Sequence, residues 1–240
     1  MSRNATLVIL IAALLLGGGC AAGGWLMGHG LVAAREADRA VAVKGLAERD
    51  VRADLAEWHV SFRRAGDGLA AVQAEIEKDA AAVSAFLAEA GFSAGEIEPA
   101  RIEVTDLLAR SYRGDNVERA RFIVSQTVRV RSGKVDLVKA ASAKLGELVR
   151  GGIAVDDRGG PNYLFTGLNG IKPGMIAEAT RNARAAAARF AEDSGSRVGA
   201  IRRASQGVFQ ILARTEGAGE SGEIDKTVRI VTTVTYGLDG

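Results

Sequence analysis

The stretch AEWHVSF, Ala56 to Phe62, alternates apolar and polar side chains with a period of two residues. A period of two is typical of a β-strand, because successive side chains of a strand point to opposite faces of its sheet. One face would carry Ala56, Trp58, Val60 and Phe62, and the other Glu57, His59 and Ser61. The stretch therefore predicts a half-buried strand.

Two later stretches repeat this alternation. RFIVSQTVRVR, residues 121–131, places Phe122, Val124, Val128 and Val130 on one face, and TVRIVTTVTY, residues 227–236, does the same with Val228, Ile230, Val234 and Tyr236. Weaker alternation predicts further strands around residues 41–46, 100–108 and 197–212. Both strong strands need partners along their edges, and an edge left open invites another subunit.

Apolar residues at helical spacing separate these strands. The first helix would begin at Asp67 as its N-cap and end before Gly91 and Phe92, a pair that suits a glycine C-cap. Its apolar positions are Leu69, Val72, Ile76, Val83 and Leu87. A second helix is expected over residues 134–149.

The third predicted helix has Pro173 near its start and Gly195 at its end. One side would carry Ile176, Ala179, Ala183, Ala186, Ala187 and Phe190. Such an alanine-rich side predicts close packing on a sheet or another helix. The chain is therefore expected to be an α+β protein, with antiparallel or mixed sheets packed against about three helices.

The N-terminal segment has no charged residue between Arg3 and Arg35. As a helix, residues 5–28 would extend about 36 Å, enough to cross a hydrocarbon core of about 30 Å. The apolar run continues after Cys20, where a cleaved signal or a lipoprotein would turn polar. These features favour a retained transmembrane anchor over residues 1–34.

Two alternatives to the anchor stay open. Residues 7–16 followed by small residues around Cys20 have the form of a cleaved secretory signal. Lipidation of Cys20 is less favoured, because Gly17 stands where lipoprotein signals usually carry leucine.

Charge around the segment predicts its orientation. The amino terminus and Arg3 lie on one side, whereas Arg35, Glu36, Asp38 and Arg39 nearly cancel on the other. The positive-inside bias favours a cytoplasmic N-terminus. Residues 35–240 would then form one exported domain behind a single-pass anchor in the inner membrane, which in a Gram-negative bacterium faces the periplasm; signal cleavage would instead release the domain there.

The exported part has neither an excess of charge nor a cysteine. Beyond residue 34 it has 30 Lys and Arg against 29 Asp and Glu, so no basic patch predicts nucleic-acid binding. Cys20 is the only cysteine and lies in the leader. The folded part therefore has neither a disulfide nor a thiol nucleophile.

Histidine and aspartate positions do not predict a catalytic or metal site. The only histidines are His29, in or beside the leader, and His59, on the polar face of a strand. Asp156 and Asp157 are adjacent in VDDRGGPNY, but an oxygen-ligand metal site needs more ligands than two neighbours supply. Turn formation is the better interpretation of this pair.

Two further polar pairs have structural explanations. Asn169 and Lys172 precede the expected third helix, a place where an anion can bind but where such residues more often cap the helix. Arg202 and Arg203 suit a solvated strand edge. We therefore expect no catalytic residue, no cofactor and no metal.

The segments VAVKGLAERDVRADLAEWHVSF and LFTGLNGIKPGMIAEATRNARAAAARFAEDSGSRVGAIRRASQGVFQI, taken in order, resemble the SIMPL-domain family of exported bacterial proteins. The matching positions are Val41, Val43, Gly45, Asp54, Ala179, Ala183, Ala186, Ala187 and Gly199. Many members carry proline before the aspartate of the second strand, where this chain has Ala53.

The resemblance implies an α+β domain whose relatives are envelope antigens or are linked to oxidative-stress defence, in at least one case as ring-like oligomers. It transfers no catalytic residue. With glycines at helical spacing in the leader, it implies a homo-oligomer. The expected function is a membrane-anchored, periplasm-facing protein that acts by self-assembly or partner binding, with a small-ligand binding module and, less favoured, an enzyme as alternatives.

Overall fold

The computed structural model describes residues 14–29, 39–109, 120–156, 159–215 and 219–239. These residues form two compact units. We call Met1–Ala47, Ile176–Val208 and Ile230–Gly240 the first unit, and Glu48–Met175 with Phe209–Arg229 the second unit. The chain therefore passes from the first unit into the second and returns twice.

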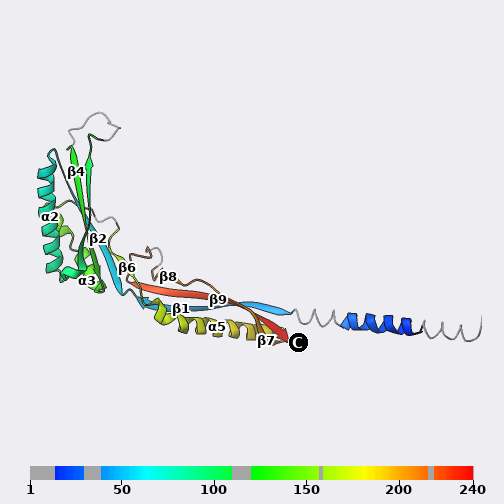
Figure 1. Ribbon diagram of the computed structural model, residues 1–240. Coiled ribbons are helices and arrows are strands. Elements are labelled where there is room, and N and C mark those ends of the chain that lie inside the picture. Colours follow the sequence, from blue (N-terminus) through cyan, green and yellow to red (C-terminus); the bar gives the residue numbers. More distant parts are fainter. Residues whose placement is uncertain (1–13, 30–38, 110–119, 157–158, 216–218, 240) are drawn as a thin grey trace, which may run out of the picture. The chain divides into compact units, whose positions relative to one another are not determined.

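The second unit is built on an antiparallel sheet with the strand order β3-β4-β2-β5, to which β6 adds by also pairing with β2 (Figure 1). Its strands are β2 (Leu55–Gly66), β3 (Ile97–Asp106), β4 (Phe122–Ser132), β5 (Val155–Asp156) and β6 (Asn162–Leu164). The alternation predicted for AEWHVSF is confirmed, since Ala56, Trp58, Val60 and Phe62 are all buried. Trp58 lies directly opposite Val130 of β4, which is buried as well.

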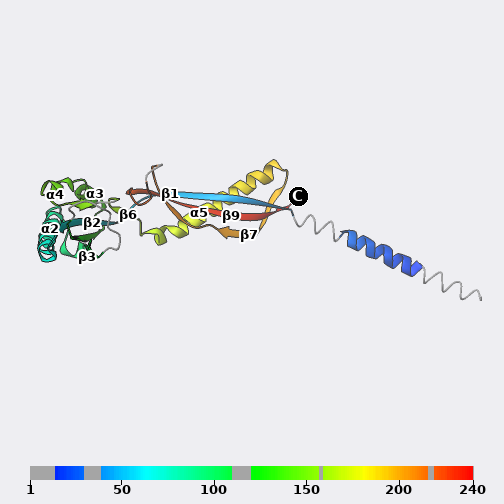
Figure 2. The same ribbon diagram turned by 90° about the horizontal axis from the view of Figure 1, so that it is seen from above.

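Helices cover the apolar face of this sheet. They are α2 (Leu69–Glu89), α3 (Val135–Ser142) and α4 (Gly146–Arg150), and Figures 1 and 2 both show α2 running along the sheet. The single helix predicted over residues 134–149 is instead two helices. A tight turn divides them, because the Leu145 N–H bonds to the carbonyl of Ser142, three residues back, and not to the residue four back.

The ends of α2 differ in how well local sequence predicted them. Asp67 is not the N-cap; Gly68 holds that position, and the Asp67 carboxylate accepts the backbone N–H of Arg121 at 3.1 Å. The glycine C-cap is confirmed: Gly91 has φ +102°, and the Phe92 N–H reaches the carbonyl of Leu87 at 3.2 Å. A long-range contact thus displaced the expected cap at one end only.

The other sheet has the order β1-β9-β7, with β8 also pairing with β9. Its strands are β1 (Ala40–Arg52), β7 (Arg197–Gln206), β8 (Gln210–Ala213) and β9 (Asp225–Asp239). In the first unit, helix α5 (Leu168–Asp193) packs on the sheet through a core of Val41, Ala183, Ala187, Val234 and Tyr236 (Figure 1). Strands 41–46, 100–108 and 197–212 were thus correctly expected, although the last divides into β7 and β8.

Helix α5 begins five residues before Pro173, so the proline lies inside it. Its buried side is a line of residues at four-residue steps: Met175, Ala179, Ala183, Ala187 and Ala191. The prediction that Phe190 lies on this packed side of the helix was wrong, because its side chain is 52% exposed. One residue corresponds to about 100° of rotation, so Phe190 points well away from Ala191. The predicted left-handed cap is confirmed at Gly195, with φ +68°.

Backbone meets backbone where α5 crosses β1. A Cβ atom on Gly45 would lie 1.8 Å from the carbonyl oxygen of Ala179 and 2.5 Å from the nitrogen of Ala183. Beside this contact, the Asn182 amide donates to the carbonyl of Leu46 at 2.8 Å. The close packing that the alanine-rich side predicted therefore depends on a glycine in the facing strand.

The two strong strands find within the chain the edge partners that they were expected to need. Strand β4 lies between β3 and β2, and β9 lies between β1 and β7. Both are therefore central strands, whose edges are already paired within the chain.

Part of the leader is described as a helix over residues 14–29, in which every residue is exposed. Among the described residues, no helix combines the length and the apolar character needed to cross a membrane. Residues 5–13 of the expected anchor lie outside the described part, so the anchor stays a prediction.

We expect Gly45→Ala to lower the free energy of unfolding by about 3 kcal/mol, because the added methyl group overlaps main-chain atoms of α5 that cannot move aside. Urea denaturation followed by circular dichroism measures the change. The matched control is Gly170→Ala, a helical position with nothing within 4 Å of the added carbon. That variant should be neutral or up to about 1 kcal/mol more stable. Equal stability of the two variants would contradict the contact.

Candidate functional site

The second unit presents two different surfaces on its sheet. Helices cover one face, whereas the other face carries polar side chains, which we call the polar face. The register places on it Glu57, His59, Ser61 and Arg63 of β2, Glu98, Arg101 and Glu103 of β3, and Ser125, Thr127, Arg129 and Arg131 of β4. Cross-strand ion pairs join Arg129 to Glu98 and, at 3.1 Å, Arg131 to Glu57.

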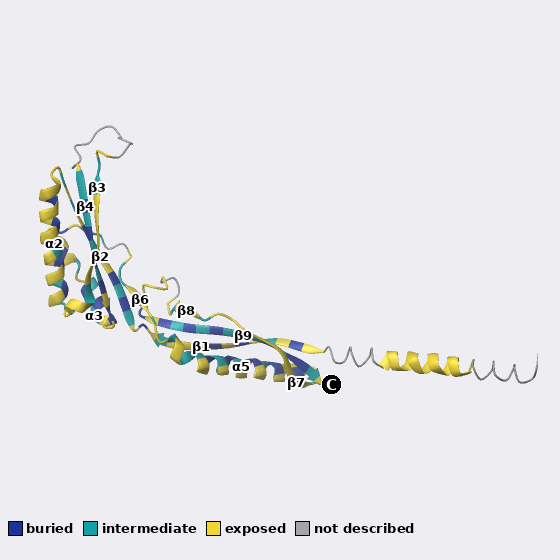
Figure 3. Ribbon diagram, in the orientation of Figure 1, coloured by how far each residue is buried: buried dark blue, intermediate teal, exposed yellow. Residues whose placement is uncertain are grey.

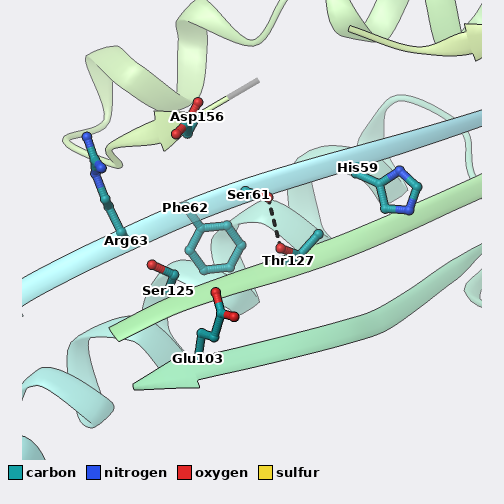
Figure 4. A pocket seen from close by; sticks show the side chains of 8 residues that line it. All are labelled: His59, Ser61, Phe62, Arg63, Glu103, Ser125, Thr127 and Asp156. Atoms are coloured by element: carbon teal, nitrogen blue, oxygen red, sulfur yellow. Dashed lines mark hydrogen bonds between the residues drawn. The ribbon is translucent and has the colours of Figure 1, made fainter. Parts of the chain in front are cut away.

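A polar hollow of about 400 Å³ lies on this face (Figure 4). Its lining residues are His59, Ser61, Phe62, Arg63, Glu103, Ser125, Thr127 and Asp156. The hydroxyl groups of Ser61 and Thr127 are hydrogen-bonded at 2.8 Å. Figure 4 shows His59 at the opposite end of the hollow from Arg63 and Asp156.

The hollow brings hydroxyl groups and carboxylates together, since Asp156 lies opposite Ser61 in the strand register and Glu103 lies opposite Ser125. Nucleophilic catalysis by serine needs a base within hydrogen-bond reach, and the partner of Ser61 is another hydroxyl group. Within the part of the chain that the structure describes, no three His, Cys, Asp or Glu residues are grouped as metal ligands. The hollow thus presents hydroxyl, carboxylate, guanidinium and imidazole groups to a polar ligand.

The polar residues singled out from the sequence do not form one site. Asp156 belongs to strand β5, and the turn follows at Gly159 and Gly160, which have φ +112° and +66°. Asp157 lies outside the described residues. The hollow that Asp156 lines contains neither Asn169 nor Lys172.

Asn169 and Lys172 do not precede the helix, as was predicted, but lie within α5. The Lys172 ammonium donates to the Asn169 side chain at 3.0 Å and lies 5.9 Å from the ring centre of Phe209. Both residues therefore have local structural partners.

The remaining candidates lie apart from the hollow. Arg202 and Arg203 are exposed on β7, the edge strand next to β9, which confirms the expected solvated edge. The His29 ring contacts the Trp25 ring in the leader helix, with 4.3 Å between ring centres.

The surface that sequence reasoning missed is an apolar groove between α2 and the edge strand β3. Two adjoining hollows of about 520 and 220 Å³ form this edge groove, and both are lined by Ala80 and Gln126. Ile102 and Val104 project from β3 with 64% and 53% of their surface exposed. In Figure 3 most of β3 is coloured as exposed.

The groove exists because α2 covers the inner strands and not β3. Ile102 and Val104 lie directly opposite Gln126 and Val124 of β4, both of which are buried. Side chains that face one another across antiparallel strands share a face of the sheet. The apolar face of the sheet therefore extends one strand beyond its helical cover.

Alternation in the sequence indicates the apolar side of β3. Ile102 and Val104 alternate with Arg101 and Glu103, which predicts a strand with one apolar side. The same pattern occurs in strands whose apolar side is buried. Only the position of β3 at the edge of the sheet leaves that side open.

A hydrogen-bond network around Glu96 holds the start of β3 against β4. Ser132 donates its hydroxyl to one carboxylate oxygen at 2.6 Å, and the Ser93 N–H and hydroxyl both reach the other at 2.8 Å. The Lys134 ammonium lies 3.1 Å from the second oxygen. These contacts, with the Ser132 bond as the largest cause, lower the pKa of Glu96 to about 2.

We expect Glu96→Gln to destabilise the protein at neutral pH and to flatten its loss of stability in acid. The pKa of Glu96 in the folded chain is about 2, against an ordinary value of 4.5. Its stabilisation is therefore complete above about pH 4.5 and is lost as the pH falls through about 2. Urea denaturation at pH 7, 5, 4 and 3 measures this dependence.

The control is Glu89→Gln, which changes an exposed carboxylate at the end of α2. This variant should keep the pH dependence of the wild type. A Glu96→Gln profile that runs parallel to the wild-type profile would show that the network does not hold the carboxylate charged.

Comparison with known families finds one match. Residues 41–236 match the family model described as SIMPL, a protein of unknown function (DUF541). The match runs from strand β1 to strand β9 and so includes residues of both units. None of the curated proteins matches the chain.

Proposed function

The chain belongs to the SIMPL family, and from that premise we propose that it is an anchored envelope protein that acts by binding proteins, including copies of itself, without catalysing a reaction. The family is described as one of unknown function, so membership supplies the fold and not the activity. Support for the proposal comes from the surfaces of the second unit and from the N-terminal segment.

The observation that carries the proposal is the edge groove. Ile102 and Val104 are more than half exposed and line one hollow of this groove next to an open strand edge. Contiguous exposed apolar surface of this kind marks interaction sites. A protein that covers them gains from the burial of apolar surface and from main-chain hydrogen bonds along β3. In the polar hollow, by contrast, the hydrogen-bond partner of the Ser61 hydroxyl group is the Thr127 hydroxyl group.

Anchoring is supported by the uncharged run between Arg3 and Arg35. The described helix over residues 14–29 exposes apolar side chains, among them Leu14, Leu15, Leu16, Trp25, Leu26 and Met27. With the amino terminus in the cytoplasm, as the charge bias favours, residues 35–240 would face the periplasm. Tolerance of envelope or oxidative stress is the physiological role that the family resemblance suggests.

Binding of a small polar ligand is the second candidate function. It is favoured by the polar hollow, where the hydroxyl groups of Ser61 and Thr127 lie near the guanidinium group of Arg63 and the carboxylate of Asp156. Such binding would leave the mass of the protein in solution unchanged. The mass of the assembly therefore distinguishes the two candidates.

We expect the leader to be retained. Mass spectrometry of the protein extracted from membranes should show residues 1–34 attached and Cys20 without acyl chains, because the apolar run continues past the cysteine. A mature N-terminus near Ala22 would show that the segment is a cleaved signal. An acylated Cys20 would show a lipoprotein.

We expect the full chain, extracted in detergent at micromolar concentration, to have the mass of at least two copies by light scattering corrected for detergent. Val104→Ser should weaken this assembly because it removes exposed apolar surface from the groove. The matched control is Val149→Ser, at a side chain exposed by 55% against 53% for Val104, but outside the groove. A mass of one chain at every concentration would reject the proposal.

A further inference from the structure

Strand β3 is the edge that the structure leaves most open to another strand. It has ten residues and a neighbour on one side only, among the strands that are described. The edge strands β5 and β6 have two and three residues, and β7 carries two register shifts with Arg202 and Arg203. The edge strand β1 has its apolar Val41 and Ala47 already buried.

We propose that β3 pairs with β3 of a second copy of the chain, antiparallel and centred on Ile102, and so joins the two sheets into one. This inference rests on the proposed function and names the partner of the edge groove. The contact is isologous, because each copy contributes the same strand to it.

Charge complementarity selects this register. When Ile102 lies opposite Ile102 of the second copy, Arg101 lies opposite the second copy's Glu103, and Glu103 lies opposite the second copy's Arg101. Both side chains are largely exposed, at 72% and 68%, and share the polar face, where they lie 3.6 Å apart within one chain. Two cross-strand ion pairs therefore form at once.

Neighbouring registers lack this complementarity. Centring the pair on Arg101 places the two copies of Arg101 opposite each other, and centring it on Glu103 does the same with two carboxylates. A centre between residues 102 and 103 places Ile102 opposite a glutamate on the same face of the sheet. Like charges or a mixed pair at these positions destabilise the pairing.

The same register covers the apolar side of the strand. Ile102 packs against its own copy, and Val104 lies opposite Ala100 of the second copy. Ile102 and Val104 are the exposed side chains that border the edge groove. The two grooves then meet across the new strand pair, so each α2 gains an apolar neighbour beyond its own sheet.

The ends of β3 limit the pairing to its central part. Pro99 has no N–H to donate, and the register with β4 shifts between Pro99 and Arg101. Further out, Glu98 lies on the polar face, whereas Asp106 lies on the same side as Ile102 and Val104, so these carboxylates do not face each other across the two copies. Each also has an arginine partner within its own chain: Arg129 of β4 for Glu98, and Arg121, just before β4, for Asp106.

A charge-swap series on the full chain in detergent tests the register. Arg101→Glu and Glu103→Arg each place like charges in both ion pairs, so each should weaken self-association by about tenfold. The double variant, Arg101→Glu with Glu103→Arg, restores opposite charges and should recover the wild-type affinity. Arg181→Glu, an exposed charge on α5, is the control and should leave the affinity unchanged.

Cross-linking gives a second readout in a Cys20→Ser background, which removes the only native cysteine. Ile102→Cys should form a disulfide-linked dimer when oxidised with diamide, because the two positions face each other. Thr105→Cys should not, because its two copies would lie six residues apart along the ladder, or about 20 Å.

The outcomes separate this inference from the proposed function. Restored affinity in the double variant and a cross-link at residue 102 alone support the pairing. Assembly that persists in both single variants, without a cross-link at residue 102, overturns the pairing and leaves the proposed function standing. A wild-type chain that stays monomeric overturns both.

Discussion

The burial of Trp58 and its neighbours on one side of β2 is the constraint from which the second unit follows. Trp58, Val60 and Phe62 are at most 1% exposed, so helices must cover this face of the sheet. Helix α2 is held there by apolar packing and by Asp79, which bonds the Arg64 guanidinium at 2.5 and 2.8 Å. Because strand geometry alternates, the same constraint places His59, Ser61 and Arg63 on the polar face.

The cover that α2 provides is narrower than the sheet. The helix packs over β2 and β4, and β3 continues the apolar face with Ile102 and Val104 beyond it. The Glu96 network holds β3 in this place although most of the strand is exposed. The groove is thus a consequence of one helix lying on a sheet that is one strand wider than the helix covers.

In the first unit, the helix packs on the sheet in a different way. Its helix brings alanines to the sheet, and Gly45 lets main-chain atoms come into contact where side chains would usually separate the layers. The hydroxyl groups of Thr232 and Tyr236 are buried in β9, and neither has a hydrogen-bond partner among the described residues. Such groups are costly in a packed interior.

Local sequence by itself determined the elements and the faces they bury. The alternation in β2, β4 and β9 predicted which residues are buried, and Gly91 and Gly195 predicted the left-handed ends of α2 and α5. These features follow from backbone geometry over a few residues, so a short window of sequence contains them.

Tertiary structure alone decided which strands are central, where the chain divides into two units, and that β3 keeps an open apolar side. Asp67 shows why local sequence was insufficient. Its carboxylate does not cap α2 as predicted but accepts the N–H of Arg121, a partner 54 residues away. Edges and grooves likewise depend on pairings such as Val104 with Val124 and on the width of the helical cover. Periodicity specifies the face on which a side chain lies, but the neighbour it meets there is set by contacts between distant parts of the chain.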